Sequence, residues 1–137
     1  MYRAFKRALL WIYLYVQVIR IHAMLQRKGF NVASKKFLSP PREGQNQSFS
    51  EQELKEIGDI VVSVCAFQLF DAQCLHRAIA SYHLLSRFGG RPVFCMSVAS
   101  RPFIGHAWCE VQERRVGDPG NGYMDQVNSA VVLRIPS

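Results

Sequence analysis

A cysteine, a histidine and an aspartate lie along the second half of this 137-residue chain with a spacing that suits nucleophilic catalysis. Cys74 opens a segment with helical periodicity, and a thiol at a helix N-terminus is favoured as the nucleophilic thiolate. His106 follows 32 residues later and can take the thiol proton and then protonate a leaving amine. Asp118, another 12 residues on, can orient the imidazole and stabilise its cation.

Each of these residues also has an ordinary structural interpretation, so their order along the chain carries the argument. A single cysteine is most often a small buried side chain, and an aspartate before Pro119 is often a turn residue. A cysteine at a helix start, then a strand histidine, then an aspartate just past a hairpin is much less common by chance. Asp125 is the alternative carboxylate if the connection after His106 is longer than a tight turn.

Apolar periodicity predicts the helices that would position these residues. Residues 4–28 read as one long helix ended by Gly29, and the capping-box pattern of Ser50 and Glu53 opens a second helix. A third runs from Cys74 to about residue 88, where two glycines stop it. Residues 30–50 hold prolines, glycine and a polar run, and are predicted to be a linker without a regular element.

The character of the chain changes after the third helix. Residues 92–98 and 105–111 are short, rich in β-branched and aromatic residues, and predicted to be neighbouring strands. A turn at Glu113 and Arg114 leads to a third strand at 116–118, and residues 130–135 form a last edge strand. Helices followed by strands predict an α+β domain, with an antiparallel sheet packed on the helix that begins at Cys74.

Composition and charge bound the function. A hydrophobic fraction of 49% excludes a disordered chain, and 137 residues suit one compact domain. The net charge of +7 lies in the first third, because residues 1–50 hold nine basic residues against one acid. The four cysteines have no metal-binding spacing, so no metal or cofactor is expected. Without a signal-peptide cleavage site, we expect reduced thiols and a cytoplasmic protein.

The basic, apolar N-terminal segment needs its own interpretation. Gln17 and Arg20 interrupt its apolar run too early for a membrane span, so we expect an amphipathic or largely buried helix. Such a helix can cover the catalytic core and present positive charge to an acidic peptide or partner. Peripheral membrane contact through residues 4–28 is the second interpretation. Nucleic acid is not an expected partner, because the basic residues form no recognised binding motif.

The run Cys-Leu-His-Arg at 74–77, the Gly-His-Ala-Trp-Cys-Glu-Val run at 105–111 and Asp118 together resemble a known family. They are similar to the transglutaminase-like cysteine peptidases that remove the leader segment of lasso-peptide precursors, over about residues 50–120. The resemblance implies a transglutaminase-like, papain-like core at residues 50–137, preceded by a helix and linker at residues 1–49. It further implies that Cys74 is the nucleophile, His106 the base and acid, and Asp118 the orienting carboxylate.

The resemblance also implies partners. These are the precursor peptide, a small separate leader-binding protein and, as a further candidate, the ATP-dependent lasso cyclase that uses the freed amine. A transglutaminase or amidase of the same fold remains the alternative, as does a non-catalytic basic adaptor. Gln68 or Gln73 is a candidate side-chain donor to an oxyanion. Cys109 is predicted to be core, since it alternates with His106, whereas His76 and His83 are predicted to be surface or packing residues.

Overall fold

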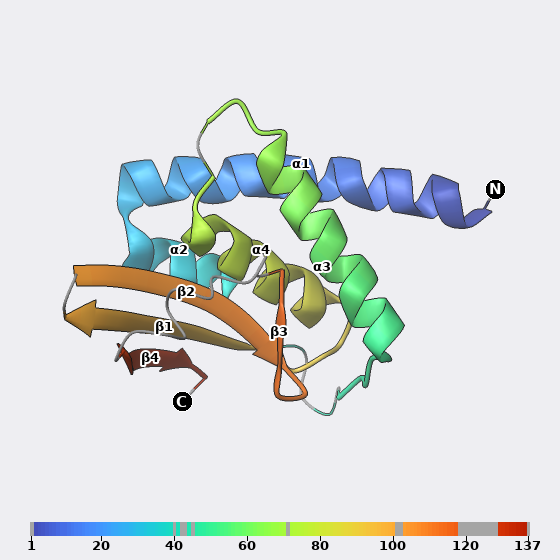
Figure 1. Cartoon of the computed structure of the whole chain (residues 1–137). Helices are drawn as coiled ribbons and strands as arrows, with labels where there is room; N and C mark the ends of the chain where they lie inside the picture. The colour runs from blue at the N-terminus through green and yellow to red at the C-terminus, as the bar shows by residue number, and fades with distance from the viewer. Residues whose placement is uncertain are drawn as a thin grey trace.

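Four helices precede a sheet of four strands in the part of the chain that the computed structural model describes, residues 2–39, 41, 44, 46–70, 72–100, 103–117 and 129–136 (Figure 1). The helices are α1 (Tyr2–Lys28), α2 (Phe30–Phe37), α3 (Glu51–Ala66) and α4 (Cys74–Arg87). The strands are β1 (Val93–Ser100), β2 (Phe103–Val111), β3 (Arg114–Val116) and β4 (Ser129–Ile135). This arrangement confirms the predicted α+β class.

The three predicted helices form with the predicted end signals. Gly29 adopts a φ of 85° and its N–H donates to the Met24 carbonyl at 3.1 Å, which ends α1. At the start of α3, the N–H of Glu53 donates to Ser50 Oγ and the N–H of Ser50 donates to the Glu53 carboxylate, both at 3.1 Å. The capping box read from the sequence is therefore confirmed.

The prediction of a linker without regular structure from residue 30 to 50 is wrong for its first part. Residues 30–37 form α2, which buries Ala33 and Phe37 against the other helices. The physical reason is the position of the helix breakers. The prolines and the polar run come only after Leu38, whereas the residues before it have apolar groups at helical spacing and no glycine or proline.

The sheet has the order β3-β2-β1-β4, and all of its neighbouring strands are antiparallel. β1 and β2 pair along their length, and β4 is an edge strand as predicted. β3 begins earlier than the predicted strand at 116–118, because Gln112 and Glu113 both adopt positive φ and form the turn themselves. Two such residues make the tight hairpin whose twist matches that of the flanking strands.

α4 lies between α1 and the sheet, and packs on β2 and on α1, α3 and α2 (Figure 1). Its Ile79, Tyr82 and Leu85 side chains are buried almost completely. A helix that is covered on nearly every side cannot shift without breaking several contacts at once, so its ends have fixed positions in the fold.

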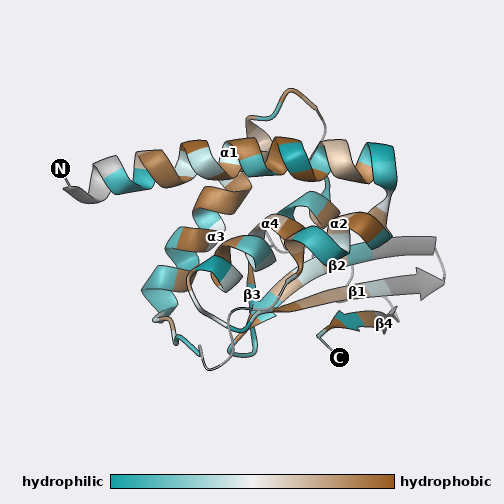
Figure 2. Ribbon diagram, turned by 180° about the vertical axis from the view of Figure 1, so that it is seen from behind, coloured by the Kyte–Doolittle hydropathy of each residue, from teal (hydrophilic) through white to brown (hydrophobic). Residues whose placement is uncertain are grey.

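α1 is amphipathic but only partly buried. Leu14, Val18 and Ile21 have no exposed surface and line the core. Apolar residues also occur elsewhere along the helix (Figure 2), and several of them are about half exposed. Among the described residues, α1 is the one helix long and apolar enough to cross a membrane, by length and composition alone. In this fold the side of α1 that carries Leu14, Val18 and Ile21 packs against the rest of the protein.

His83 joins three helices. From α4 it makes a 3.0 Å hydrogen bond with the hydroxyl of Tyr13 on α1, and the ring of Phe37 on α2 meets it edge-on. Burial, together with the guanidinium groups of Arg87 and Arg20, lowers the pKa of His83 from its usual 6.5 to about 4. The prediction that His83 is a surface or packing residue is thus confirmed as packing.

The lowered pKa of His83 predicts an acid limb in the stability of the protein. The unfolded chain binds a proton at His83 below about pH 6.5, whereas the folded chain does so only near pH 4. The free energy of unfolding should therefore fall as the pH drops from 6.5 to 4. His83→Gln keeps a partner for Tyr13 and should flatten this fall in urea titrations at several pH values. An unchanged slope would contradict the assignment.

Candidate functional site

Cys74 is the first residue of α4 and the only one of the four cysteines that is not buried. The backbone N–H groups of the first helical turn carry the positive end of the helix dipole and favour negative charge there, and no acidic side chain lies in that turn. The prediction that Cys74 lies at a helix N-terminus is therefore confirmed.

The other three cysteines are buried thiols. Burial raises the pKa of Cys65 to about 11 and also raises that of Cys95, where the Glu110 carboxylate adds to the effect. The pKa of Cys109 lies well above its usual value, mainly because of burial. Cys109 has no exposed surface and belongs to the core, as predicted. These environments suppress thiolate, which leaves Cys74 as the candidate nucleophile.

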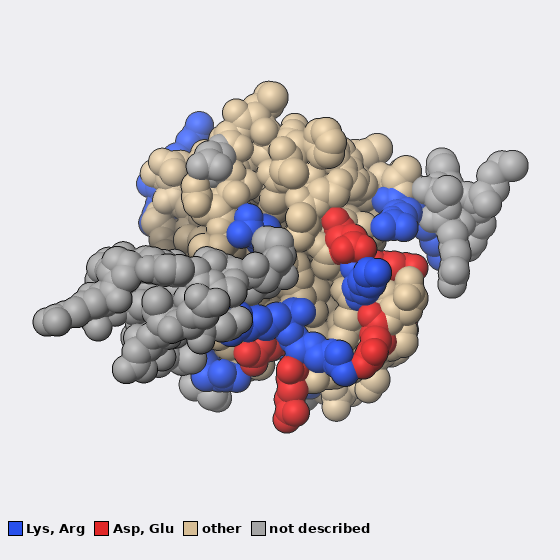
Figure 3. Space-filling model, viewed as in Figure 1, with Lys and Arg blue, Asp and Glu red and all other residues tan. Residues whose placement is uncertain are grey.

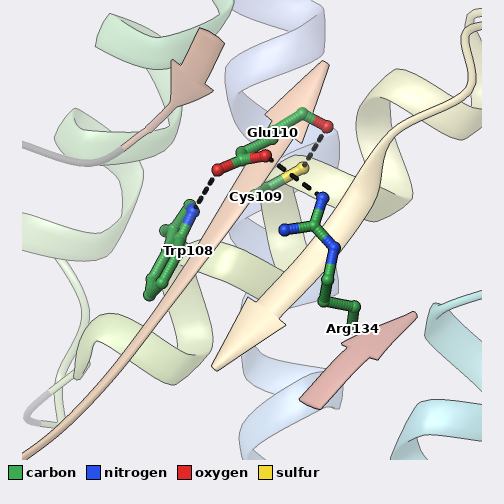
Figure 4. Close-up of polar contacts among 4 residues, drawn as sticks. All are labelled: Trp108, Cys109, Glu110 and Arg134. Atoms are coloured by element: carbon green, nitrogen blue, oxygen red, sulfur yellow. Dashed lines mark hydrogen bonds and ion pairs between the residues drawn. The ribbon is translucent and has the colours of Figure 1, made fainter. Parts of the chain in front are cut away.

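His106 lies on β2, buried, with its ring stacked on that of Trp108 at a centroid distance of 5.7 Å. The guanidinium of Arg115 on β3 covers the Trp108 ring at 4.4 Å. The Trp108 indole N–H donates to the Glu110 carboxylate at 2.8 Å, and Glu110 pairs with Arg134 of β4 at 3.5 Å (Figure 4). These contacting side chains thus form an ordered row on one face of the sheet, and the row fixes the orientation of the His106 imidazole ring.

The two faces of β2 have different surroundings. Ala107, Cys109 and Val111 belong to the core beneath α4, and His106 and Trp108 alternate with them. β3 pairs with β2 only opposite residues 109–111, so its pairing has ended before His106. Cys74 and His106 are therefore carried by two elements, α4 and β2, that pack against each other.

Gly117 follows β3 and packs closely against α3 and α4. It has a φ of 71°, and a Cβ there would collide with Ser81 Oγ and lie 3.1 Å from the Val61 side chain. Ser81 is seven residues after Cys74, so the two share one side of α4, about 10 Å apart along its axis. Gly117 therefore lies against the side of α4 that carries Cys74. Asp118 itself and Asp125 lie outside the described residues.

A pair of histidines supports the N-terminus of α4. The N–H of Gln73, the residue before Cys74, donates to His76 Nδ1 at 3.0 Å, and His76 Nε2 lies 3.0 Å from His22 Nδ1 of α1. A backbone N–H can only donate, so His76 is protonated at Nε2 and donates to His22. His76 is buried, so of the two predicted alternatives, surface or packing, the packing one is confirmed. Its capping role was missed because histidine is not a usual partner in a capping box.

The two glutamine candidates have different positions. Gln73 is the N-cap of α4, directly beside Cys74. Gln68 donates through its side-chain amide to the carbonyl of Tyr15 at 3.3 Å, which ties the turn before α4 to α1. Its Oε1 is buried without a hydrogen-bond partner in the described part of the chain. Gln68 is thus anchored to α1 rather than free to follow a substrate.

A groove of about 730 Å³ lies between α3 and β3, and Gly117 is among the residues that line it. Lys55 and Asp59 line it from α3, and Arg114 and Arg115 from β3. Because Arg115 also covers Trp108, the groove is connected through two stacked side chains to His106. No sequence pattern predicts this groove, because it depends on how α3 and the hairpin pack. Within the described residues, no group of His, Cys, Asp and Glu side chains is arranged to hold a metal ion.

The close packing of Gly117 can be tested against a second glycine. Gly44 also has a positive φ, of 88°, but a Cβ there meets open space. Gly44→Ala should cost about 1 kcal/mol from backbone strain alone. Gly117→Ala should cost about 1–3 kcal/mol more, because Ser81 and Val61 must move. Urea denaturation of both variants measures the difference, and equal losses would contradict the close contact.

The capping role of His76 has a matched pair of substitutions. His76→Ala removes the acceptor for the Gln73 N–H and should lower the free energy of unfolding by about 1–2 kcal/mol. His76→Gln should recover most of this loss, because a glutamine at the same position completes a capping box. Chemical denaturation decides the matter. If alanine and glutamine are equally destabilising, the hydrogen bond to Gln73 is not what stabilises the helix start.

Comparison with known proteins agrees with this geometry. A model of the transglutaminase-like superfamily matches residues 16–130, which is most of the chain. No curated protein and no solved structure gives a significant match. Proteins with this fold are typically cysteine peptidases or acyltransferases, in keeping with a partly exposed thiol at the start of a helix that packs on the strand carrying a histidine. The chain belongs to the transglutaminase-like superfamily.

Proposed function

We propose that this protein is a cysteine peptidase that removes the leader segment from a ribosomally made lasso-peptide precursor, with Cys74, His106 and Asp118 as its triad. The observation that carries the proposal is the contrast among the cysteines. Cys74 alone is partly exposed, at the start of a helix packed on the strand that holds His106. The motifs around these residues resemble the leader peptidases of that pathway.

The proposed reaction is acyl transfer to water in two steps. His106 takes the Cys74 proton, the sulfur attacks the scissile carbonyl, and the protonated imidazole then gives that proton to the leaving amine. The backbone N–H of Cys74, at the open end of α4, is a candidate donor to the oxyanion. Water, deprotonated by the same imidazole, hydrolyses the thioester and restores the thiol. Asp118 would hold the imidazole tautomer throughout.

Three features of the fold support this assignment. Trp108 stacks on His106 and is itself covered by Arg115, so the imidazole has a fixed ring plane. Gly117, the residue before Asp118, packs against the side of α4 that carries Cys74. The groove between α3 and β3 is also lined by Gly117, and it would receive the peptide.

The substrate and partners follow from the resemblance. The substrate would be the precursor peptide, gripped by a small separate leader-binding protein. The freed N-terminal amine would then pass to the ATP-dependent lasso cyclase, and all of these steps would take place in the cytoplasm. Lys55, Arg114 and Arg115 give the groove a basic side that suits a peptide carrying acidic residues, although Arg114 is paired with Glu51.

The test combines the protein with a candidate precursor and its leader-binding protein, and follows the products by mass spectrometry. Cys74→Ala and His106→Ala should each reduce turnover by a factor on the order of 10⁴ or more. Cys95→Ala and Cys65→Ala are the matched controls and should retain cleavage. Asp118→Asn compared with Asp125→Asn identifies the carboxylate. Cleavage by Cys74→Ala would overturn the proposal.

The same assay separates a peptidase from an acyltransferase of this fold. Added hydroxylamine competes with water for the thioester, so a peptidase should give mainly the free acid and only a minor hydroxamate at modest amine concentration. An amide product formed in place of the acid, from a natural amine, would instead identify the transglutaminase alternative. A protein that shows neither product with any precursor, yet binds the leader-binding protein, would be the non-catalytic adaptor.

A further inference from the structure

An apolar face remains exposed on the outer side of α1 and on the turn that precedes α4. On α1 the exposed residues recur at helical spacing, so they form one line on the side opposite the buried Leu14, Val18 and Ile21. In the turn, Leu69 is 99% exposed and Phe67 is 68% exposed. We call this the outer apolar face, and its residues are Leu9, Ile12, Val16, Ile19, Phe67 and Leu69.

The turn at residues 67–70 is held against α1, so the two parts form one surface. The Tyr15 hydroxyl donates to the Phe67 carbonyl at 3.3 Å, and the rings of Trp11 and Phe67 lie 6.2 Å apart. Phe70 stacks on His22 at 3.8 Å. The turn rises beyond α1 at the outer edge of the molecule (Figure 1). Exposed apolar groups held in place on a projecting turn would remain in water at a cost unless something covers them.

The charges around this face are of one sign. α1 has no acidic residue in its 27 positions. Its exposed Arg20 and Arg27 follow Val16 by 4 and 11 residues and so lie on the side of the outer apolar face, whereas Lys6 and Arg7 line a pocket with Glu53 and Glu56 of α3. In the view of Figure 3 the top of the molecule is mostly uncharged between basic groups on either side, and the acidic groups lie below it. A convex apolar surface with a cationic border matches an anionic lipid surface.

We propose that the outer apolar face docks on an anionic lipid surface, with α1 parallel to the membrane plane. The buried line of α1 stays in the protein core, so only its outer half enters the headgroup region. Leu69 and Phe67 insert as the most exposed apolar side chains, and Arg20 and Arg27 contact lipid phosphates. This surface is separate from the groove at β3, so the proposal does not depend on the peptidase activity.

The experiment is co-sedimentation of the full chain with vesicles. Binding to vesicles made equally of phosphatidylcholine and phosphatidylglycerol should be strong and should weaken as salt is raised. Binding to vesicles of phosphatidylcholine alone should be at least about tenfold weaker. Leu69→Asp and Ile12→Asp should each reduce binding about tenfold, with unchanged melting temperatures because both side chains are exposed. Gln52→Asp makes the same charge change on the exposed start of α3 and should leave binding unchanged.

Other outcomes would overturn the proposal. Equal vesicle binding by Leu69→Asp and the unchanged protein would mean that the outer apolar face is not the contact. If the protein binds no vesicles and light scattering shows a dimer that Ile12→Asp dissociates, the face is covered by a second copy of the chain. Cys74→Ala should bind vesicles like the unchanged protein, so a failure here is distinct from a failure of the peptidase assignment.

Discussion

The burial of α4 is the constraint on which the rest of the structure depends. This helix contacts β2 on one side and three helices on the others, and most of its side chains from Ala78 to Leu85 are inaccessible. Because it is fixed along its length, the position of its first residue is fixed as well. Cys74 therefore sits at a defined point beside the sheet, and the geometry of any reaction at its sulfur is set by packing far from the thiol.

Neutral groups complete the support of this helix start. The backbone N–H of Gln73, the residue before Cys74, donates to the ring of His76 rather than to a carboxylate. His76 is in turn hydrogen-bonded to His22 of α1. A carboxylate in the same place would oppose the negative charge that a thiolate brings. The arrangement keeps the backbone ordered without reducing the positive end of the helix dipole that a nucleophilic cysteine uses.

The sequence was most informative where one local pattern decides the outcome. Helical spacing with end signals predicted α1, α3 and α4, and alternation along β2 predicted that Cys109 faces the core while Trp108 shares a face with His106. α2 was not predicted because the linker prediction extends the effect of helix breakers that begin at residue 39 to the nine residues before them. The close contact of Gly117 and the capping by His76 depend on elements distant in sequence, so no local pattern could predict them.

The turn at residues 67–70 connects the outer apolar face to the start of α4. Its exposed tip belongs to the outer apolar face, while the ring of Phe70 packs on His22 and lies 5.3 Å from that of His76. His76 holds the backbone of Gln73, which is bonded to Cys74. These contacts link α1, in the basic first third of the chain, through Phe70 and His76 to the backbone at the start of α4, where the candidate nucleophile lies. A surface that binds Leu69 and Phe67 would therefore restrain the turn that precedes this helix start.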